Sequence, residues 1–333
     1  MSAISPGDDV LGLDRLSINQ CSLPSGARED RPDAMLAQRR TPFIAVIGPG
    51  AIGTVVAAAL HEQGRTPFIA GRSSRPELRL EYEHETVVVP GPIHTDPGEF
   101  QGTADLVFLA VKATQTAAAA SWLATLCGQG TVVCVLQNGV EQREAVEPLV
   151  LGGSVVPAVV WFPAARQPGG SVTLLSLPRL SLPDVPGSEV IVNAMRGSRC
   201  VVDVSLEFTT LAWRKLLQNA AAGLMALTGR RSGMYRREDI GRLALGYLQE
   251  CAAVARAEGA NLDDDEAVRV LEQFRAAPTD RGTSILSDRE RRQPLEWDVR
   301  NAVIQRRGSA HGIPTPISDI LVPLLAAASD GPG

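Results

Sequence analysis

Three glycines with a fixed spacing lie in FIAVIGPGAIG, between an apolar run and an alanine-rich run. They belong to a turn formed by Gly48, Pro49, Gly50, Ala51, Ile52 and Gly53. In a dinucleotide fingerprint the first glycine permits the tight turn, the second lets backbone approach the pyrophosphate, and the third allows close packing of helix on strand. The phosphates would lie against free N–H groups at the helix N-terminus. The turn therefore predicts dinucleotide binding; the alternative is a purely structural strand-to-helix turn.

The end of the next expected strand bears on the choice of cofactor. Sites for NAD usually hold the ribose 2′-hydroxyl with an Asp or Glu about twenty residues after the glycines. This chain has Arg72 there, followed by Ser73 and Ser74. Because a guanidinium beside hydroxyl groups suits a 2′-phosphate, the sequence favours NADP(H). A solvated surface arginine is the alternative.

Polar residues also follow two later strands. Lys112 ends DLVFLAVK, and Asn138 ends TVVCVLQN. Ligands of doubly wound sheets bind at the carboxyl ends of the strands, so we interpret both residues as part of a binding site. Two solvated loop residues are the alternative.

In WRKLLQN, Lys215 and Asn219 stand four residues apart, so both project from one face of a helix. That face is otherwise small and apolar, and a lysine there needs a partner or a chemical task. The alternative is a lysine at the edge of a helical bundle whose head group reaches solvent.

A serine and a glutamate lie further along, at Ser284 and Glu296. Pro294 fits the first turn of a helix, which would place Glu296 in that same turn. The helix dipole favours a carboxylate there, so Glu296 should stay ionised and accept hydrogen bonds rather than donate a proton. A capping glutamate is the alternative.

Two kinds of scaffold must position these residues. From Phe43 to about Ser205, short β-branched runs alternate with helical stretches, one of them an alanine-rich helix of about four turns in residues 113–130. This alternation predicts a doubly wound, mostly parallel sheet covered on both faces. Residues 155–205 are expected to add antiparallel strands. Helical periodicity then predicts an all-helical domain from the segments 206–229, 237–259 and 294–312.

Composition excludes several classes of partner. The 333 residues carry a net charge of −5 with both signs interspersed, which argues against nucleic acid and anionic membranes. No run of about eighteen apolar residues is present, so no membrane span is expected. Five scattered cysteines without a CxxC predict reduced thiols in a cytoplasmic protein, and four histidines without ligand spacing predict no metal site.

In their order and spacing, GPGAIG, VKATQ, QNG, WRKLLQN, SILSD and EWDVRNAVIQRRGSAHGIPTP resemble the ketopantoate reductase (2-dehydropantoate 2-reductase) family. The resemblance covers about residues 43–325. It implies a Rossmann domain followed by an all-helical domain, with the active site in the cleft between them. We therefore expect a disordered extension in residues 1–40, an NADP-binding Rossmann domain in 41–205 and a helical substrate domain in 206–328.

The resemblance also implies an activity, NADPH-dependent reduction of a 2-keto acid. The substrate would be ketopantoate, giving pantoate in pantothenate biosynthesis, or a related branched keto compound. A cytoplasmic enzyme is expected, with a homodimer as its candidate assembly. The alternative from another class is a non-catalytic NADP(H)-binding sensor on the same fold, and the presence of both Lys215 and Glu296 argues against it.

The family's residues fall on positions singled out above. Its cofactor-binding residues fall on the turn 48–53, Arg72, Lys112 and Asn138, and Asn138 would also face the substrate. Its proton-donating lysine falls on Lys215, whose pKa burial near Lys112 would lower. Its other substrate-binding residues fall on Asn219, Ser284 and Glu296. With Lys215, Glu296 would be catalytic and would orient Lys215 or a substrate hydroxyl.

One position departs from the family's pattern. Many members place a second substrate asparagine one helical turn after the first, where this chain has Gly223. A lost donor beside a bound hydroxyl should cost about 1–3 kcal/mol in recognition. Hydride transfer is still expected, and the departure favours a further alternative, a reductase of another branched keto compound in secondary metabolism.

Overall fold

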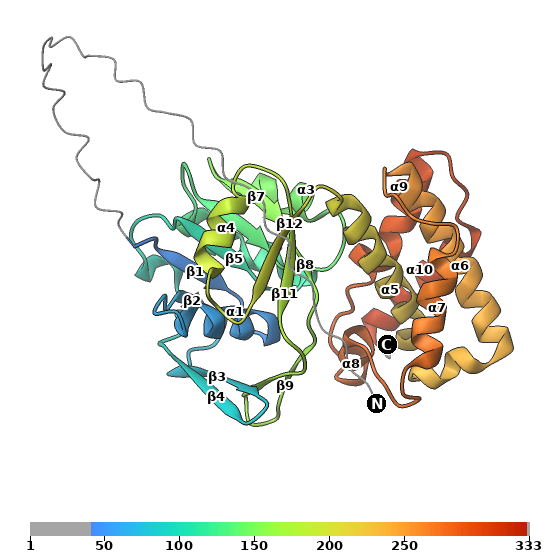
Figure 1. Cartoon of the computed structure of the whole chain (residues 1–333), viewed down its shortest axis with the longest axis horizontal. Coiled ribbons are helices and arrows are strands. Elements are labelled where there is room, and N and C mark those ends of the chain that lie inside the picture. Colours follow the sequence, from blue (N-terminus) through green and yellow to red (C-terminus); the bar gives the residue numbers. More distant parts are fainter. Residues whose placement is uncertain (1–40, 332–333) are drawn as a thin grey trace, which may run out of the picture. The chain divides into compact units, whose positions relative to one another are not determined.

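The apolar, β-branched runs of the N-terminal half form a parallel sheet (Figure 1). The computed structural model describes residues 41–331, so the extension expected in residues 1–40 lies outside the described residues. The strands, in the spatial order β2-β1-β5-β6-β7, are β1 (Ile44–Ile47), β2 (Phe68–Ala70), β5 (Leu106–Leu109), β6 (Val132–Val135) and β7 (Ser154–Pro157). All neighbours are parallel, and the order reverses between β1 and β5. The glycine turn follows β1 and Lys112 follows β5, so both lie at the switch point where such sheets bind ligands.

Helices cover both faces of this sheet, and the core lies between them. The residues of β1, β5 and β6 are all buried, as expected for a sheet with two covered faces. The helices that share a hydrophobic core with one face are α1 (Ala51–His61) and α4 (Ser188–Met195). Those on the other face are α2 (Ala120–Leu126) and α3 (Gln142–Val146).

The prediction of an alanine-rich helix of about four turns in residues 113–130 is wrong. The segment after Lys112 winds first through two 3₁₀ turns, η2 (Ala113–Gln115) and η3 (Ala117–Ala119), and only then enters the seven residues of α2. The N–H of Ala113 is bonded to Glu296, and the hydroxyl of Thr116 accepts from Gln137. The two turns are closed by hydrogen bonds of the 3₁₀ type, from the N–H of Gln115 to the carbonyl of Lys112 and from the N–H of Ala119 to the carbonyl of Thr116.

Two smaller sheets complete the β-rich half. One has the order β4-β3-β10-β9, formed by β3 (Glu77–Tyr82), β4 (Glu85–Pro90), β9 (Ala164–Arg166) and β10 (Val172–Leu174). The other has the order β12-β11-β8, formed by β8 (Val159–Val160), β11 (Arg179–Pro183) and β12 (Val201–Ser205). The antiparallel strands expected in residues 155–205 are present in the pairs β8–β11 and β9–β10. In the same range β7 pairs with β6, and β12 pairs with β11, both in parallel.

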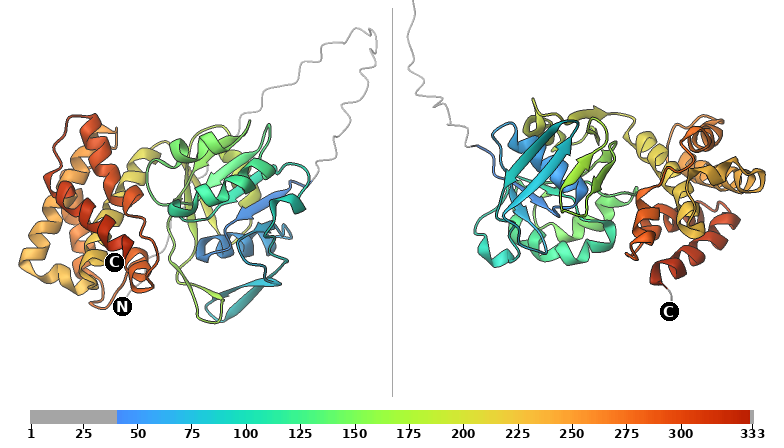
Figure 2. Two further views of the ribbon diagram at one scale, coloured as in Figure 1. Left: turned by 180° about the vertical axis from the view of Figure 1, so that it is seen from behind. Right: turned by 90° about the horizontal axis from the view of Figure 1, so that it is seen from below.

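Helices of residues 208–330 gather in one bundle, coloured yellow to red in Figure 2. They are α5 (Phe208–Thr228), α6 (Glu238–Ala257), α7 (Glu266–Ala276), α8 (Ser284–Glu290), α9 (Val303–Ala310) and α10 (Pro316–Asp330). A π-helical turn, η6 (Asp298–Ala302), leads into α9, and the remaining 3₁₀ turns are η1 (Pro97–Glu99), η4 (Glu147–Leu149) and η5 (Ser232–Arg236). The bundle core is centred on α5 and α6, with Trp213 and Tyr247 among its largest buried side chains.

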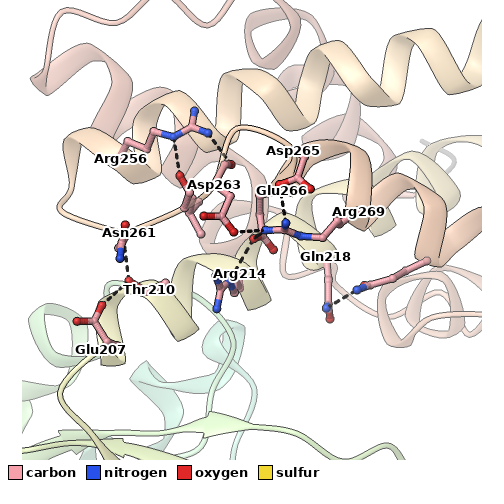
Figure 3. A network of polar contacts seen from close by, with 12 residues as sticks. Glu207, Thr210, Arg214, Gln218, Arg256, Asn261, Asp263, Asp265, Glu266 and Arg269 are labelled. Atoms are coloured by element: carbon pink, nitrogen blue, oxygen red, sulfur yellow. Dashed lines mark hydrogen bonds and ion pairs between the residues drawn. The ribbon is translucent and has the colours of Figure 1, made fainter.

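Polar contacts fix one face of α5 against α7 and the loop before it (Figure 3). Thr210 Oγ1 accepts from the N–H of Asn261 at 2.9 Å, and Arg214 Nε donates to Glu266 at 3.2 Å. Because Thr210 and Arg214 are four residues apart, they share a face of α5. The neighbouring face, which carries Lys215, is left to contact the β-rich half.

Within residues 41–331, no helix is long and apolar enough to cross a membrane. The four cysteines of this range, Cys127, Cys134, Cys200 and Cys251, are buried free thiols.

Candidate active site

The turn after β1 leaves open space in front of a helix N-terminus. Gly48 has φ 95°, in the region that favours glycine, and a Cβ on Gly53 would lie 2.2 Å from the Gly48 carbonyl oxygen. A Cβ on Gly50 would meet nothing within 4 Å. Gly50 caps α1 without a side-chain hydrogen bond, and the first turn carries no acidic residue. Free N–H groups beside an open space fit the pyrophosphate of a dinucleotide.

Arginines gather where the 2′-phosphate is expected. Arg72 is exposed in the bend after β2, with no hydrogen bond or ion pair to any residue in 41–331. Arg75, which the sequence analysis missed, donates from Nη2 to the carbonyl of Pro49 at 3.0 Å. Burial, with the nearby charge of Arg166, lowers the pKa of Arg75. This end of the turn is therefore suited to an anion.

A chain of hydrogen bonds joins four of the predicted site residues through Glu296. Asn219 Nδ2 donates to Asn138 Oδ1 at 3.2 Å, and Asn138 Nδ2 donates to Glu296 Oε2 at 3.0 Å. Arg300 Nη2 donates both to Glu296 Oε2 at 2.8 Å and to Ser284 Oγ at 3.1 Å. Residues from the loop after β6 and from three helical segments, α5, α8 and η6, are thus linked through one carboxylate.

The expected location of Glu296 in a helical turn is wrong. The chain is non-helical from Gln293 to Glu296, and helix begins at Trp297. Glu296 Oε1 accepts the N–H of Ala113 at 3.1 Å, and Oε2 accepts from Asn138 and Arg300, so the carboxylate links the β-rich half to the helical segment that follows it. Burial would raise the pKa of Glu296, but the Arg300 charge and the hydrogen bonds to Ala113, Arg300 and Asn138 hold it below its usual value. The carboxylate therefore stays ionised.

Lys215 lies in a narrow pocket beside this chain of contacts. The pocket is lined by Gln137, Asn138, Gly139, Gln142, Ala158, Val159, Val160, Ala212, Lys215, Leu216 and Asn219. The ammonium lies 5.3 Å from the ring centroid of Trp161. Within residues 41–331, no hydrogen bond or ion pair engages its Nζ, so the expected contact with Glu296 is absent. The proton of Lys215 is free for another acceptor.

The pKa of Lys215 is lowered to about 8, mainly by burial and further by the charges of Arg300 and Arg281. The predicted lowering of the Lys215 pKa is therefore right, but the prediction that Lys112 is the neighbouring cation is wrong. Lys112 instead forms an ion pair with the buried carboxylate of Asp288 in α8. The chain has only two lysines, Lys112 and Lys215.

Arg300 was not predicted from the sequence. Its side chain is 2% exposed, yet it links Glu296 to Ser284. An arginine in a helical segment four residues after a glutamate resembles a surface ion pair, so only the tertiary structure reveals that it is buried.

Gly223 makes room for an amide from another segment. A Cβ at Gly223 would lie 2.6 Å from Asn301 Nδ2, and Asn301 is fully buried. Its Nδ2 donates to Tyr247 Oη at 2.8 Å and to the carbonyl of Ala220 at 3.2 Å. The place beside α5 where the family pattern has a second asparagine is therefore closed by Asn301.

Gly223→Ala is expected to destabilise the protein by about 1–3 kcal/mol. The new methyl group must displace the buried side-chain amide of Asn301, which donates two hydrogen bonds. The melting temperature of the variant checks this. Gly246→Ala on α6 is the matched control, since its Cβ would meet only the end of the Ile317 side chain, at 3.0 Å. Equal melting temperatures for the wild type and Gly223→Ala would show that Asn301 moves aside freely.

The sequence matches a family profile and several curated relatives that carry the same name. The sequence profile described as "Ketopantoate reductase PanE/ApbA" matches residues 44–187, and its C-terminal counterpart matches residues 207–329. The 2-dehydropantoate 2-reductases of two Mycobacterium tuberculosis strains are 54% identical over 291 residues, covering 87% of this chain and 99% of theirs. That of Caulobacter vibrioides is 35% identical, covering 86% of this chain and 99% of its own.

Solved structures agree with the sequence matches. A PanE/ApbA family ketopantoate reductase from Ralstonia eutropha superposes with a TM-score of 0.77 at 30% identity, covering 86% of this chain and 98% of that chain. A dimeric ketopantoate reductase from Staphylococcus aureus superposes with a TM-score of 0.78 at 25% identity, covering 87% and 99%.

Proposed function

Because this chain belongs to the ketopantoate reductase family, we propose that it reduces 2-dehydropantoate to pantoate with NADPH, Lys215 supplying the proton. The observation that carries the assignment of Lys215 is its free ammonium with a lowered pKa, one helical turn from Asn219.

Family membership confirms three predictions made from the sequence. The resemblance and the fold class are both right. The reaction class is that of the family, the reduction of a keto acid by an NADP-dependent oxidoreductase. The substrate and the roles of individual residues belong to the proposal.

NADPH would be held by the turn 48–53, with Arg72 at the 2′-phosphate, and it supplies the hydride when bound. Reduction of a ketone leaves negative charge on oxygen, which a preorganised cation stabilises. Lys215 polarises the carbonyl and then gives its proton to that oxygen. A pKa of about 8 keeps much of Lys215 protonated near neutral pH while making its proton easier to release.

Asn138 and Asn219 flank Lys215 in the pocket and are bonded to each other. We assign them to the polar groups of the substrate. Ser284 is exposed at the first turn of α8 and is assigned to the same task. Glu296 accepts three hydrogen bonds, and its task is to hold Asn138 and Arg300 in place. Lys112 is assigned to the cofactor, which it contacts after its ion pair with Asp288 breaks.

Replacing Arg72 with alanine is expected to raise the Kd for NADPH at least about tenfold, since a charge-assisted contact to the 2′-phosphate is worth more than 1.4 kcal/mol. Binding of NADH should barely change. Fluorescence titration with both cofactors measures the effect, and Arg79→Ala, an exposed arginine of β3 paired with Glu77, is the control. Equal losses for NADPH and NADH would show that Arg72 does not contact the 2′-phosphate.

We also propose a cytoplasmic homodimer acting in pantothenate biosynthesis. The dimer is supported by the dimeric ketopantoate reductase from Staphylococcus aureus, which shares the fold.

A panel of 2-keto acids tests the substrate. The purified chain should oxidise NADPH fastest with 2-dehydropantoate. A higher kcat/KM for another branched keto acid would move the assignment to that compound, as Gly223 suggested. No oxidation with any member of the panel, alongside tight NADPH binding, would favour the non-catalytic sensor.

A further inference from the structure

Arg300 is a buried cation at the substrate end of the proposed site. Its guanidinium, which is always charged, is 2% exposed, and its ion-pair partner Glu296 is 4% exposed. A buried guanidinium is costly unless it is paired and hydrogen-bonded. Folding alone would be satisfied by an apolar side chain at this position of η6, so the arginine calls for a further explanation.

The contact with Ser284 defines what the serine can do. A guanidinium only donates hydrogen bonds, so Ser284 Oγ is the acceptor of Arg300 Nη2 at 3.1 Å. The hydroxyl hydrogen is then directed elsewhere, and no residue in 41–331 accepts it. Since Ser284 is exposed, this hydrogen is available to an acceptor from outside the protein.

The charges around this hydroxyl favour an anion. Lys215 and Arg300 are close enough that the Arg300 charge lowers the pKa of Lys215, and Arg281 acts in the same direction. Two carboxylates oppose them: Glu296, which already accepts three hydrogen bonds, and Asp288, one turn after Ser284 on α8, which pairs with Lys112. Arg300 Nε is buried and has no partner within residues 41–331. The Ser284 hydroxyl and Arg300 Nε therefore lack hydrogen-bond acceptors from the protein, in a region where cations gather.

We propose that Arg300 is a positioning residue that sets the specificity of this site for substrates with a carboxylate, by holding Ser284 with its hydroxyl directed at that carboxylate and by keeping Glu296 in place. The inference rests on the proposed function and deepens it. Ser284 contacts the substrate, and Arg300 acts through Ser284 and Glu296.

The test compares a carboxylate with its neutral counterpart. Wild type, Arg300→Lys, Arg300→Met and Ser284→Ala are assayed with 2-dehydropantoate and with its primary amide. Arg300→Met should raise KM for the acid about 10–100-fold, the effect of losing charge-assisted hydrogen bonding, and change KM for the amide far less. Arg300→Lys should restore part of the acid preference. Arg275→Met, which removes an arginine of α7 paired with Glu272, is the control and should change neither.

A double-mutant cycle separates this role from simple support of the fold. If Arg300 acts through Ser284, the effect of Arg300→Lys on acid preference should largely vanish in the Ser284→Ala background. Arg300→Lys keeps a buried cation, and Ser284→Ala removes only a hydroxyl. The double-mutant cycle therefore does not require that Arg300→Met folds. Equal losses for acid and amide, or fully additive effects in the cycle, would overturn the inference.

Calorimetry keeps this inference distinct from the proposed function. Binding of pantoate and of pantoic amide to the NADP⁺ complex is measured for the wild type and Arg300→Lys. A wild type that binds pantoate in preference to the amide but turns over no keto acid overturns the proposed reduction only. A wild type that binds both equally overturns the role of Arg300, whatever its activity.

Discussion

Lys215→Ala is expected to lower kcat by about 10²–10⁴-fold, the usual contribution of a positioned acid–base group. The affinity for NADPH should stay nearly unchanged, because the glycine turn and Arg72 lie after β1 and β2, whereas Lys215 lies on α5. Steady-state kinetics and a cofactor titration on the same preparation measure both. The control is Arg214→Ala, whose side chain occupies the neighbouring face of α5 and pairs with Glu266. A wild-type kcat in Lys215→Ala would overturn the assignment of the proton donor.

The pH dependence of the reaction follows from the same residue. A proton donor must be protonated, so kcat should fall as the pH rises through about 8, the lowered pKa of Lys215. Lys215→Ala should lose this alkaline limb. Because the chain has only two lysines, carbon-13 labelling of lysine gives two side-chain signals that can be titrated separately. The signal that disappears in Lys215→Ala should titrate near 8; titration above 10 would contradict the role of burial.

Gly50→Val is expected to weaken NADPH binding by at least about a hundredfold, since the side chain would occupy the space where backbone must approach the pyrophosphate. The fold should survive, because a Cβ at Gly50 meets nothing within 4 Å. A cofactor titration and a melting curve measure the two effects. Gly169→Val, in a loop with equally open space, should change neither.

A contrast within the same turn sharpens this prediction. Gly53→Ala would place its Cβ 2.2 Å from the Gly48 carbonyl, so this variant should lose the fold as well as the cofactor. Normal NADPH binding by Gly50→Val would show that the turn is an ordinary strand-to-helix connection.

Local patterns were sufficient to predict the elements that carry the site. Gly48–Gly53 follow a buried strand, and Lys215 and Asn219 share a face of one long helix that Gly229 ends with φ 65°. These features depend on neighbours within a few residues, so periodicity and turn chemistry suffice.

The relations between distant segments could not be predicted in this way. The location of Glu296 depends on the N–H of Ala113, 183 residues away. The partner of Lys112 is Asp288, 176 residues away. Arg300 looks like a solvent-exposed residue in sequence because burial of a charge is decided by tertiary packing. The scarcity of lysine, two among 32 basic residues, is the signal that could have ranked Lys112 and Lys215 highest.

The central claim is that this site reduces 2-dehydropantoate with NADPH, and product formation tests it most directly. The full chain is incubated with both compounds, and pantoate and oxidised cofactor are quantified together. We expect one pantoate for each NADPH consumed, with the yield per unit time falling about 10²–10⁴-fold in Lys215→Ala. NADPH bound but not consumed, or consumed without formation of pantoate, would contradict it.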